Sequence, residues 1–241
     1  KGYGTASGVP AGVWSSGTNI NTARGTSAGV GNKTEGLIFG GYANPPNTRY
    51  ANTESLDGTT WTEVGDLNTA KNYVARGGIG TVTAALCVGG EPGSTISEET
   101  ESWNGSSWTA VADVNSPHVK SGGGGTQTAG IVFASIAPSP AKGHTENTGR
   151  GDGCGAGIQS SAWYTGGEEP TLSAKTESWN GSAWAETGDL NTARYDLAGT
   201  GGNNTNGLVF GGTPPLRANT ELFNGTSWTE VNDLSTALVP L

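Results

Sequence analysis

The stretch TESWNGSSWTAVADVNSPH, residues 100–118, decides the fold because close copies of it recur along the chain, at 53–71, 176–194 and 220–238. An apolar run that closes on a glycine pair precedes each copy: GLIFGG at 36–41, ALCVGG at 85–90, AWYTGG at 162–167 and GLVFGG at 207–212. A fifth run, GIVFAS at 130–135, lacks the glycines. The Glu of the phrase recurs at 54, 101, 146, 177 and 221, with spacings of 47, 45, 31 and 44 residues. Such a period indicates an array of similar units of about 45 residues.

Each unit predicts four short strands. Asn104-Gly105 lies between two β-prone runs and indicates a two-residue hairpin turn. Pairing across that turn would set Trp103 opposite Ser106 and Glu101 opposite Trp108, with both indoles on one face. The apolar run is typical of a buried strand. Gly-rich runs at 25–31, 74–80, 121–126 and 197–202 suit a further strand near a common axis, where backbones approach closely.

Antiparallel four-stranded units at this period predict an all-β fold, namely a β-propeller of about five blades in a single domain. The alternative is that these blades belong to a larger ring. We expect residues 1–24 to form an N-terminal strand or the end of a preceding blade, because GVWSSGTNINTAR at 12–24 resembles the end of a repeat. The blades would then be 25–71, 72–118, an incomplete third at 119–152, 153–194 and 195–241. The third blade is expected to be incomplete, since only 31 residues separate Glu146 from the next recurring Glu, Glu177.

The repeats resemble the kelch family: an apolar strand ending in a glycine pair, an aromatic strand and a Trp-centred strand. The paired glycines at 40–41, 89–90, 166–167 and 211–212 match the family's pair. Trp103 and Trp179 stand at its usual Tyr. The Trp that follows this Tyr in the family's pattern is matched by Trp61, Trp108, Trp184 and Trp228. The resemblance covers nearly the whole chain and implies a propeller, but kelch repeats serve scaffolds, enzymes and lectin-like modules alike.

Composition narrows the classes of partner and cofactor. The net charge is −9, and the 12 Lys and Arg are scattered singly, so we expect no nucleic-acid partner. No run approaches the length of a membrane span. The two Cys and two His lack metal-ligand spacing, so we expect no metal and no cofactor. Cys87 and Cys154 are expected to be buried thiols in Gly-rich strands, with a single disulfide as the alternative. Met is absent, which favours a mature form or a fragment.

Residues that recur in every repeat are best explained by packing, because a single ligand site would not require five copies of the same residue. Arg24, Lys71 and Arg194 occupy one repeat position and are expected to satisfy carbonyls or the Glu of a neighbouring blade. The recurring Glu have the same interpretation. A carboxylate ring that binds Ca²⁺ is the alternative, although the spacing of calcium loops is absent.

Binding is expected where the repeats differ, in the loops between the second and third strands. These loops should share one rim with the returns from one blade to the next, opposite the Asn-Gly turns. The first, YANPPNTRYA at 42–51, combines aromatic and amide side chains that can stack on and hydrogen-bond sugars or peptides. The alternative is an ordinary surface loop. The candidate ligand-binding residues are Tyr42, Asn44, Asn47, Arg49, Tyr50, Glu168, Glu169 and Arg217.

These features favour a non-enzymatic structural or binding propeller. Near-identical repeats, acidic charge and high Gly resemble the kelch-type arrays of phage tail and virion proteins. That resemblance implies other structural proteins of a virion or appendage as partners, a glycan or protein receptor on a host surface, and a location on the virion or an extracellular surface. The alternatives are a peptide-binding kelch scaffold and a soluble lectin. No axial constellation of the kind an enzyme needs is evident in the sequence.

Overall fold

The computed structural model describes residues 17–76, 78–133, 150–168 and 171–237. These residues form strands, turns and loops and contain no helix. The strands group into four four-stranded antiparallel sheets and a two-stranded one, each numbered here by the repeat that supplies it. A small hairpin, β3 (Tyr42–Ala43) with β4 (Thr48–Arg49), lies in the loop of the first repeat.

The strands of each sheet follow one another from the inside outward. Sheet 1 contains β1 (Ala28–Asn32), β2 (Glu35–Phe39), β5 (Thr53–Leu56) and β6 (Trp61–Glu63). Sheet 2 contains β7 (Ile79–Thr81), β8 (Ala84–Val88), β9 (Thr100–Trp103) and β10 (Trp108–Ala110). Sheet 3 is the pair β11 (Gly122–Thr126) and β12 (Ala129–Phe133). Sheet 4 contains β13 (Cys154–Ile158), β14 (Ser161–Thr165), β15 (Thr176–Trp179) and β16 (Trp184–Glu186). Sheet 5 contains β17 (Ala198–Asn203), β18 (Asn206–Phe210), β19 (Thr220–Phe223) and β20 (Trp228–Glu230).

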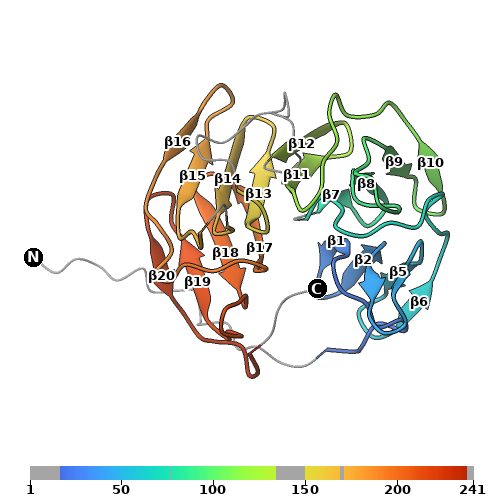
Figure 1. Cartoon of the computed structure of the whole chain (residues 1–241), viewed down its shortest axis with the longest axis horizontal. Helices are drawn as coiled ribbons and strands as arrows, with labels where there is room; N and C mark the ends of the chain where they lie inside the picture. The colour runs from blue at the N-terminus through green and yellow to red at the C-terminus, as the bar shows by residue number, and fades with distance from the viewer. Residues whose placement is uncertain (1–16, 77, 134–149, 169–170, 238–241) are drawn as a thin grey trace, which may run out of the picture.

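The sheets stand around a common centre in a propeller-like arrangement (Figure 1). The Gly-rich first strands lie innermost, and β1 contacts β7, β7 contacts β11, β11 contacts β13, and β13 contacts β17. Glycine is needed where two of them cross, because a Cβ on Gly124 would collide with the backbone of Gly157. Four complete blades are present; the expected five are not confirmed, since sheet 3 has two strands and residues 134–149 lie outside the described part.

The expected register of the aromatic hairpin is wrong. Trp103 pairs with Trp108, and Glu101 with Ala110, so the turn has four residues rather than two. The cause is the Asn104 side chain, whose Oδ1 accepts the backbone N–H groups of Ser106 and Ser107, both at 3.0 Å, in an Asx turn. Gly105 supplies the positive φ of 95° that the turn requires. The indoles do share one face as expected, with ring centroids 5.3 Å apart.

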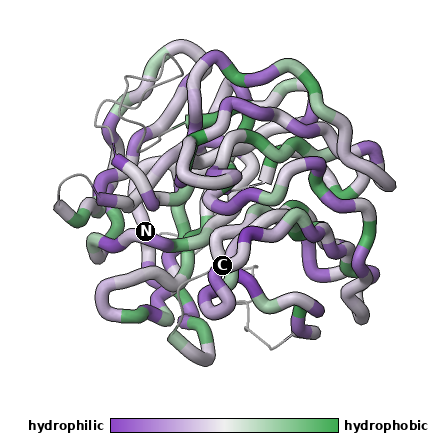
Figure 2. The backbone as a smooth tube through the Cα atoms, turned by 45° about the vertical axis from the view of Figure 1, so that its right-hand side comes forward, coloured by the Kyte–Doolittle hydropathy of each residue, from purple (hydrophilic) through white to green (hydrophobic). Residues whose placement is uncertain are grey.

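The core lies between successive sheets. Leu37 and Phe39 of sheet 1 pack against Cys87, Trp103 and Trp108 of sheet 2. Clusters of the same kind join sheets 3 and 4 and sheets 4 and 5. Figure 2 shows hydrophobic and hydrophilic stretches alternating along the chain. Sheets 2, 4 and 5 therefore hide their aromatic faces against the sheet before them, as the repeat predicts.

Candidate functional site

Recurring charged residues form buried ion pairs between successive repeats, as expected. Arg24 Nη1 lies 2.9 Å from Glu54 Oε1, Arg150 Nη1 lies 2.7 Å from Glu177 Oε1, and Arg194 Nη1 lies 2.9 Å from Glu221 Oε1. All six of these side chains are 1 % exposed or less. In the second repeat the cation is Lys71, 3.1 Å from Glu101 and 3.0 Å from Glu99. Burial opposes the charge of Lys71, but these carboxylates raise its pKa above the ordinary value.

The same Glu also receives the segment that returns from the preceding repeat. Asn68 donates its backbone and side-chain N–H groups to Glu101 Oε2, and Asn191 does the same to Glu221. Asn21 donates its backbone N–H to Glu54 Oε2 at 2.6 Å. Four of the five recurring Glu are thus engaged by protein groups, which removes the calcium-ring alternative for them; Glu146 lies outside the described residues. Within the described ranges, no group of three or more His, Cys, Asp and Glu is placed to hold a metal ion.

The returns end in a ring of five residues around the axis, here called the axial ring, which the sequence reading missed. Four members stand two positions after the Arg or Lys of their return, and Lys120 stands two positions after His118. All five have a left-handed φ between 50° and 58°, which non-glycine residues rarely adopt. Backbone N–H groups link neighbours: Tyr73 donates to Thr26 O, Lys120 to Tyr73 O, and Asp196 to Asp152 O. The ring consists of Thr26, Tyr73, Lys120, Asp152 and Asp196.

The backbone of the axial ring repeats, but its side chains do not. Lys120 Nζ lies 2.7 Å from Asp152 Oδ2 and 4.9 Å from the centre of the Tyr73 ring. Burial alone would lower the pKa of Lys120, but its hydrogen bond and ion pair with Asp152 raise it above the ordinary value. Thr, Tyr, Lys and Asp therefore stand at one repeat position, so the side chains of the ring differ from repeat to repeat.

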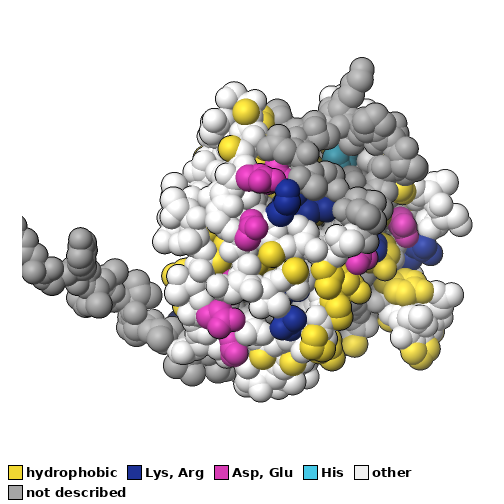
Figure 3. Space-filling view, turned by 60° about the vertical axis from the view of Figure 1, so that its left-hand side comes forward, with side chains coloured by type: hydrophobic (Ala, Val, Ile, Leu, Met, Phe, Trp, Pro, Cys, Tyr) yellow, Lys and Arg dark blue, Asp and Glu magenta, His cyan; other side chains and the backbone are white. Residues whose placement is uncertain are grey.

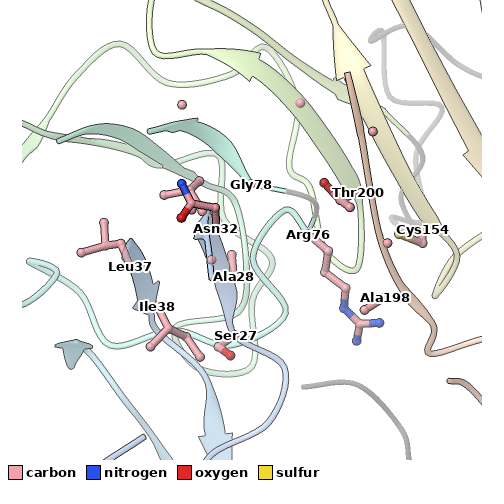
Figure 4. Close-up of a pocket in the computed structure, with 18 of the residues that line it drawn as sticks. Ser27, Ala28, Asn32, Leu37, Ile38, Arg76, Gly78, Cys154, Ala198 and Thr200 are labelled. Carbon is pink, nitrogen blue, oxygen red and sulfur yellow. The ribbon is translucent and has the colours of Figure 1, made fainter. Parts of the chain in front are cut away.

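Arg76 lies beside the ring and pairs with two of its members. Counted forward from the returns, its position holds glycine in the other four repeats, at Gly29, Gly123, Gly155 and Gly199, and the second repeat has two extra residues before β7. The guanidinium reaches Asp196 Oδ1 at 3.0 Å and Asp152 Oδ1 at 3.9 Å, on two other blades. In Figure 4 the side chain extends toward Ala198 of sheet 5. An arginine among aligned glycines was a signal that the sequence offered.

The four variable loops in the described part of the chain lie on the face of the axial ring. Each of these four starts beside a return, since Gly25 bridges to Tyr42, Asn72 to Glu91, Gly151 to Glu168 and Tyr195 to Thr213; the loop of the third repeat lies outside the described residues. The Asn-Gly turns lie at the other ends of the strands. We call the face with the loops and the ring the rim face. On another side of the molecule, Figure 3 shows acidic groups and single basic side chains on a mostly uncharged surface.

The first loop is braced internally and against the second repeat. The Tyr42 hydroxyl donates to Asn47 Oδ1. Arg49 donates from Nη2 to Gly93 O at 2.6 Å and from Nε to Asn72 Oδ1 at 3.1 Å, and it lies 3.8 Å from Glu91. Asn44 and Asn47 are exposed, and Tyr50 is half-buried. The structure thus brings five of the candidate residues together and shows that Arg49 also holds a neighbouring loop.

The other candidates lie on later blades. Glu168 is half-buried, and its backbone pairs with Gly151. Glu169 lies outside the described residues. Arg217 is half-buried and donates from Nη2 to Pro214 O at 3.3 Å. Burial and, to a lesser degree, the charge of Arg217 lower the pKa of Arg194, although Glu221 opposes this.

A cleft of about 890 Å³ separates sheets 1 and 5 and continues along the axis. Sheet 1 contributes Leu37, Ile38 and Trp61, and sheet 5 contributes Ala198, Thr200 and Phe210 (Figure 4). Arg76 lines the cleft as well. The cleft therefore lies where the first and last sheets of the described chain face each other.

Both cysteines are free and buried, and the disulfide alternative is wrong. Cys154 lies on the Gly-rich strand β13, as expected, but Cys87 lies on the apolar strand β8. Burial raises the pKa of each thiol to about 12. Neither thiol is therefore a nucleophile at neutral pH.

No protein-family model matches the chain, and no curated protein matches its sequence. The kelch resemblance thus stays a prediction from the repeats. No helix in the described ranges is long and apolar enough to span a membrane. In the structure, the residues that recur in the repeats join the blades, and residues that differ between the repeats lie on the rim face.

Proposed function

We propose that this protein is a non-enzymatic binding propeller of the kelch type that contacts a glycan or protein on a host surface through its rim face. In this proposal the propeller has five blades, and β11 and β12 of sheet 3 are the inner half of the blade that is incomplete in the described residues. The chain would belong to a virion tail or a surface appendage. The resemblance of its near-identical, acidic, Gly-rich repeats to kelch-type phage arrays supports that placement.

The observation that carries the proposal is the contrast between buried and rim positions. Four copies of the cation–Glu pair are almost unexposed and can reach no ligand. The residues that change from repeat to repeat, in the axial ring and in the loop at 42–50, lie together on the rim face. Variable residues on a rigid frame are the usual arrangement of a binding surface.

The chemistry of the first loop fits a polar, ring-containing ligand. Tyr42 offers an aromatic face, while the exposed Asn44 and Asn47 offer amide donors and acceptors. Because Arg49 and the Tyr42 hydroxyl already hold the loop, little conformational entropy would be lost on binding. Several copies on one particle would multiply weak contacts.

Two measurements test the proposal. Native material is sedimented and analysed by mass spectrometry; co-migration with structural proteins of a particle supports the placement, and migration as a free protein contradicts it. Purified protein is then applied to glycan and peptide arrays. Binding to glycans or to folded surface proteins supports the function. Selective binding to short peptides would favour the scaffold alternative, and turnover of an arrayed polysaccharide would contradict a non-enzymatic role.

A further inference from the structure

The two kinds of large aromatic side chain lie in different parts of the molecule. The Trp side chains of sheets 2, 4 and 5 belong to the buried clusters between sheets. Four of the five Tyr that the structure describes are half-buried on the rim face, in the first loop and at the ends of two returns. A Tyr side chain combines an apolar ring with a polar hydroxyl, so it can stay partly exposed and still stack on a ligand. These four are Tyr42, Tyr50, Tyr73 and Tyr195.

Two of these residues are joined by a continuous set of contacts between the first loop and the axis. The segment that bridges to Tyr42 continues into Thr26, whose carbonyl oxygen accepts the backbone N–H of Tyr73 at 3.0 Å. The guanidinium carbon of Arg49 lies 6.0 Å from the centre of the Tyr42 ring, and its Nε donates to Asn72 Oδ1, beside Tyr73. We call the surface formed by Tyr42, Arg49, Tyr73 and Lys120 the tyrosine patch.

Both cations of the tyrosine patch face a carboxylate. Lys120 lies 2.7 Å from Asp152, and Arg49 lies 3.8 Å from Glu91. The side chains of Arg49, Glu91 and Lys120 are 32 %, 30 % and 28 % exposed, so a ligand can reach them. The patch therefore presents N–H donors and carboxylate acceptors in equal number, with its charges already balanced.

This balance favours an uncharged ligand that carries hydroxyl groups. A hydroxyl group can accept a hydrogen bond from Arg49 and donate one to Glu91 at the same time. A carboxylate, sulfate or phosphate group only accepts, and it would have to compete with Glu91 for the same guanidinium. The ligand class that the patch selects is therefore decided by the carboxylate beside Arg49 as much as by Arg49 itself.

The tyrosine patch also lacks the large apolar anchors that carry most of the binding energy in protein interfaces. Six large hydrophobic residues are well exposed in the described part of the chain, and none of them belongs to the patch. Leu172 and Leu216, for example, lie in the loops of sheets 4 and 5. Within the proposed function, these observations favour a sugar over a protein as the ligand of this part of the rim face.

We propose that the tyrosine patch binds uncharged sugar units in preference to uronic, sialic or sulfated ones. Sugar rings would stack on Tyr42 and Tyr73, and ring hydroxyls would bridge Arg49 and Glu91. This inference rests on the proposed binding function and names the ligand class of the same rim face.

Polysaccharide pairs that differ only in charge test the preference. The full chain is applied to immobilised dextran and carboxymethyl dextran, galactan and polygalacturonate, and mannan and polymannuronate. We expect the neutral member of at least one pair to bind about tenfold more tightly than its acidic counterpart. Because no net charge is involved, this binding should be unchanged between about 50 and about 500 mM NaCl.

The possible failures of the two proposals differ. Equal or tighter binding of the acidic members, weakened by salt, would overturn the neutral preference and leave the proposed function standing. Binding to folded surface proteins but to no polysaccharide would do the same. A protein that binds neither saccharides nor surface proteins would contradict the proposed function as well.

A charge-balance variant tests the placement of the site. Glu91→Gln removes the carboxylate that faces Arg49 and should raise the affinity for the acidic member of the bound pair about fivefold. Glu186→Gln changes the net charge equally but releases the exposed Lys175 of sheet 4, and should cause no such gain. No gain in the folded Glu91 variant, or an equal gain in both variants, would overturn the placement. If a variant fails to fold, the wild-type comparison of neutral and acidic members still decides the preference.

Discussion

Arg76 and Asp196 form an ion pair across the propeller axis, 3.0 Å between Nη1 and Oδ1, although 120 residues separate them in the chain. Arg76 belongs to the second repeat and Asp196 to the fifth. Because Asp152, at the end of the segment that leads into sheet 4, lies beside the same guanidinium, one side chain joins three repeats. Arg76 thus joins repeats at the centre of the propeller, as the buried Glu ion pairs join neighbouring repeats.

Arg76→Gly would give the second repeat the glycine of the other four. We expect the free energy of unfolding to fall by about 2 kcal/mol, because Asp196 loses the cation 3.0 Å away, while the buried Asp152 keeps Lys120 at 2.7 Å. Chemical denaturation measures this. Lys175→Ala, which breaks the exposed pair with Glu186, serves as the control and should cause no measurable change. Equal stability of Arg76→Gly and wild type would show that the axial pairs contribute nothing.

Glu177→Gln tests the recurring ion pairs. It leaves Arg150, 1 % exposed, without its carboxylate, and we expect a loss of about 3 kcal/mol in the free energy of unfolding. The variant should still bind any ligand of the rim face once folded. A large loss of binding by the folded variant would mean that the Glu pairs do more than join blades.

How far the sequence predicts this molecule depends on the range of the interaction. The strands, their order and ion pairs such as Arg24–Glu54 could be predicted from the sequence, because residues that make the same contact in every blade recur at the same position of the repeat. The hairpin register was wrong because one Asn104 side chain, by accepting two backbone N–H groups, lengthens the turn beyond what backbone preference alone indicates. Arg76 occurs once and pairs across the axis, so only its contrast with four aligned glycines could have indicated it.

The first repeat gives a pH test of the Asx turn. Asp57 replaces the turn Asn, and hydrogen bonds from the backbone N–H groups of Thr59 and Thr60 lower its pKa below the ordinary 3.8. A lowered folded-state pKa means that the turn's contribution is present above about pH 4 and is lost as the pH falls through the folded pKa. Asp57→Asn should therefore match wild type at pH 7 and lose less stability on acidification. Parallel acid titration curves for the two proteins would refute this role.

The two thiols should be inert in the folded protein. With both pKa values raised to about 12, iodoacetamide at pH 8 should modify Cys87 and Cys154 only after denaturation, as mass spectrometry can show. A raised folded-state pKa also means that the thiols' stabilising effect is complete below their unfolded pKa of about 9 and disappears as the pH rises toward 12. Replacing both with Ser should flatten this alkaline loss; rapid alkylation of native protein would contradict their burial.

The central claim is that the rim face binds and the opposite face does not, and binding by matched double variants tests it most directly. Tyr42→Ala with Arg49→Ala alters the first loop, and Lys33→Ala with Thr83→Ala alters exposed residues at the opposite ends of the strands. Affinity is measured for the strongest arrayed glycan or surface protein, after circular dichroism has confirmed folding. The account predicts at least tenfold weaker binding for the rim variant and unchanged binding for the other. Unchanged binding by the folded rim variant would contradict it.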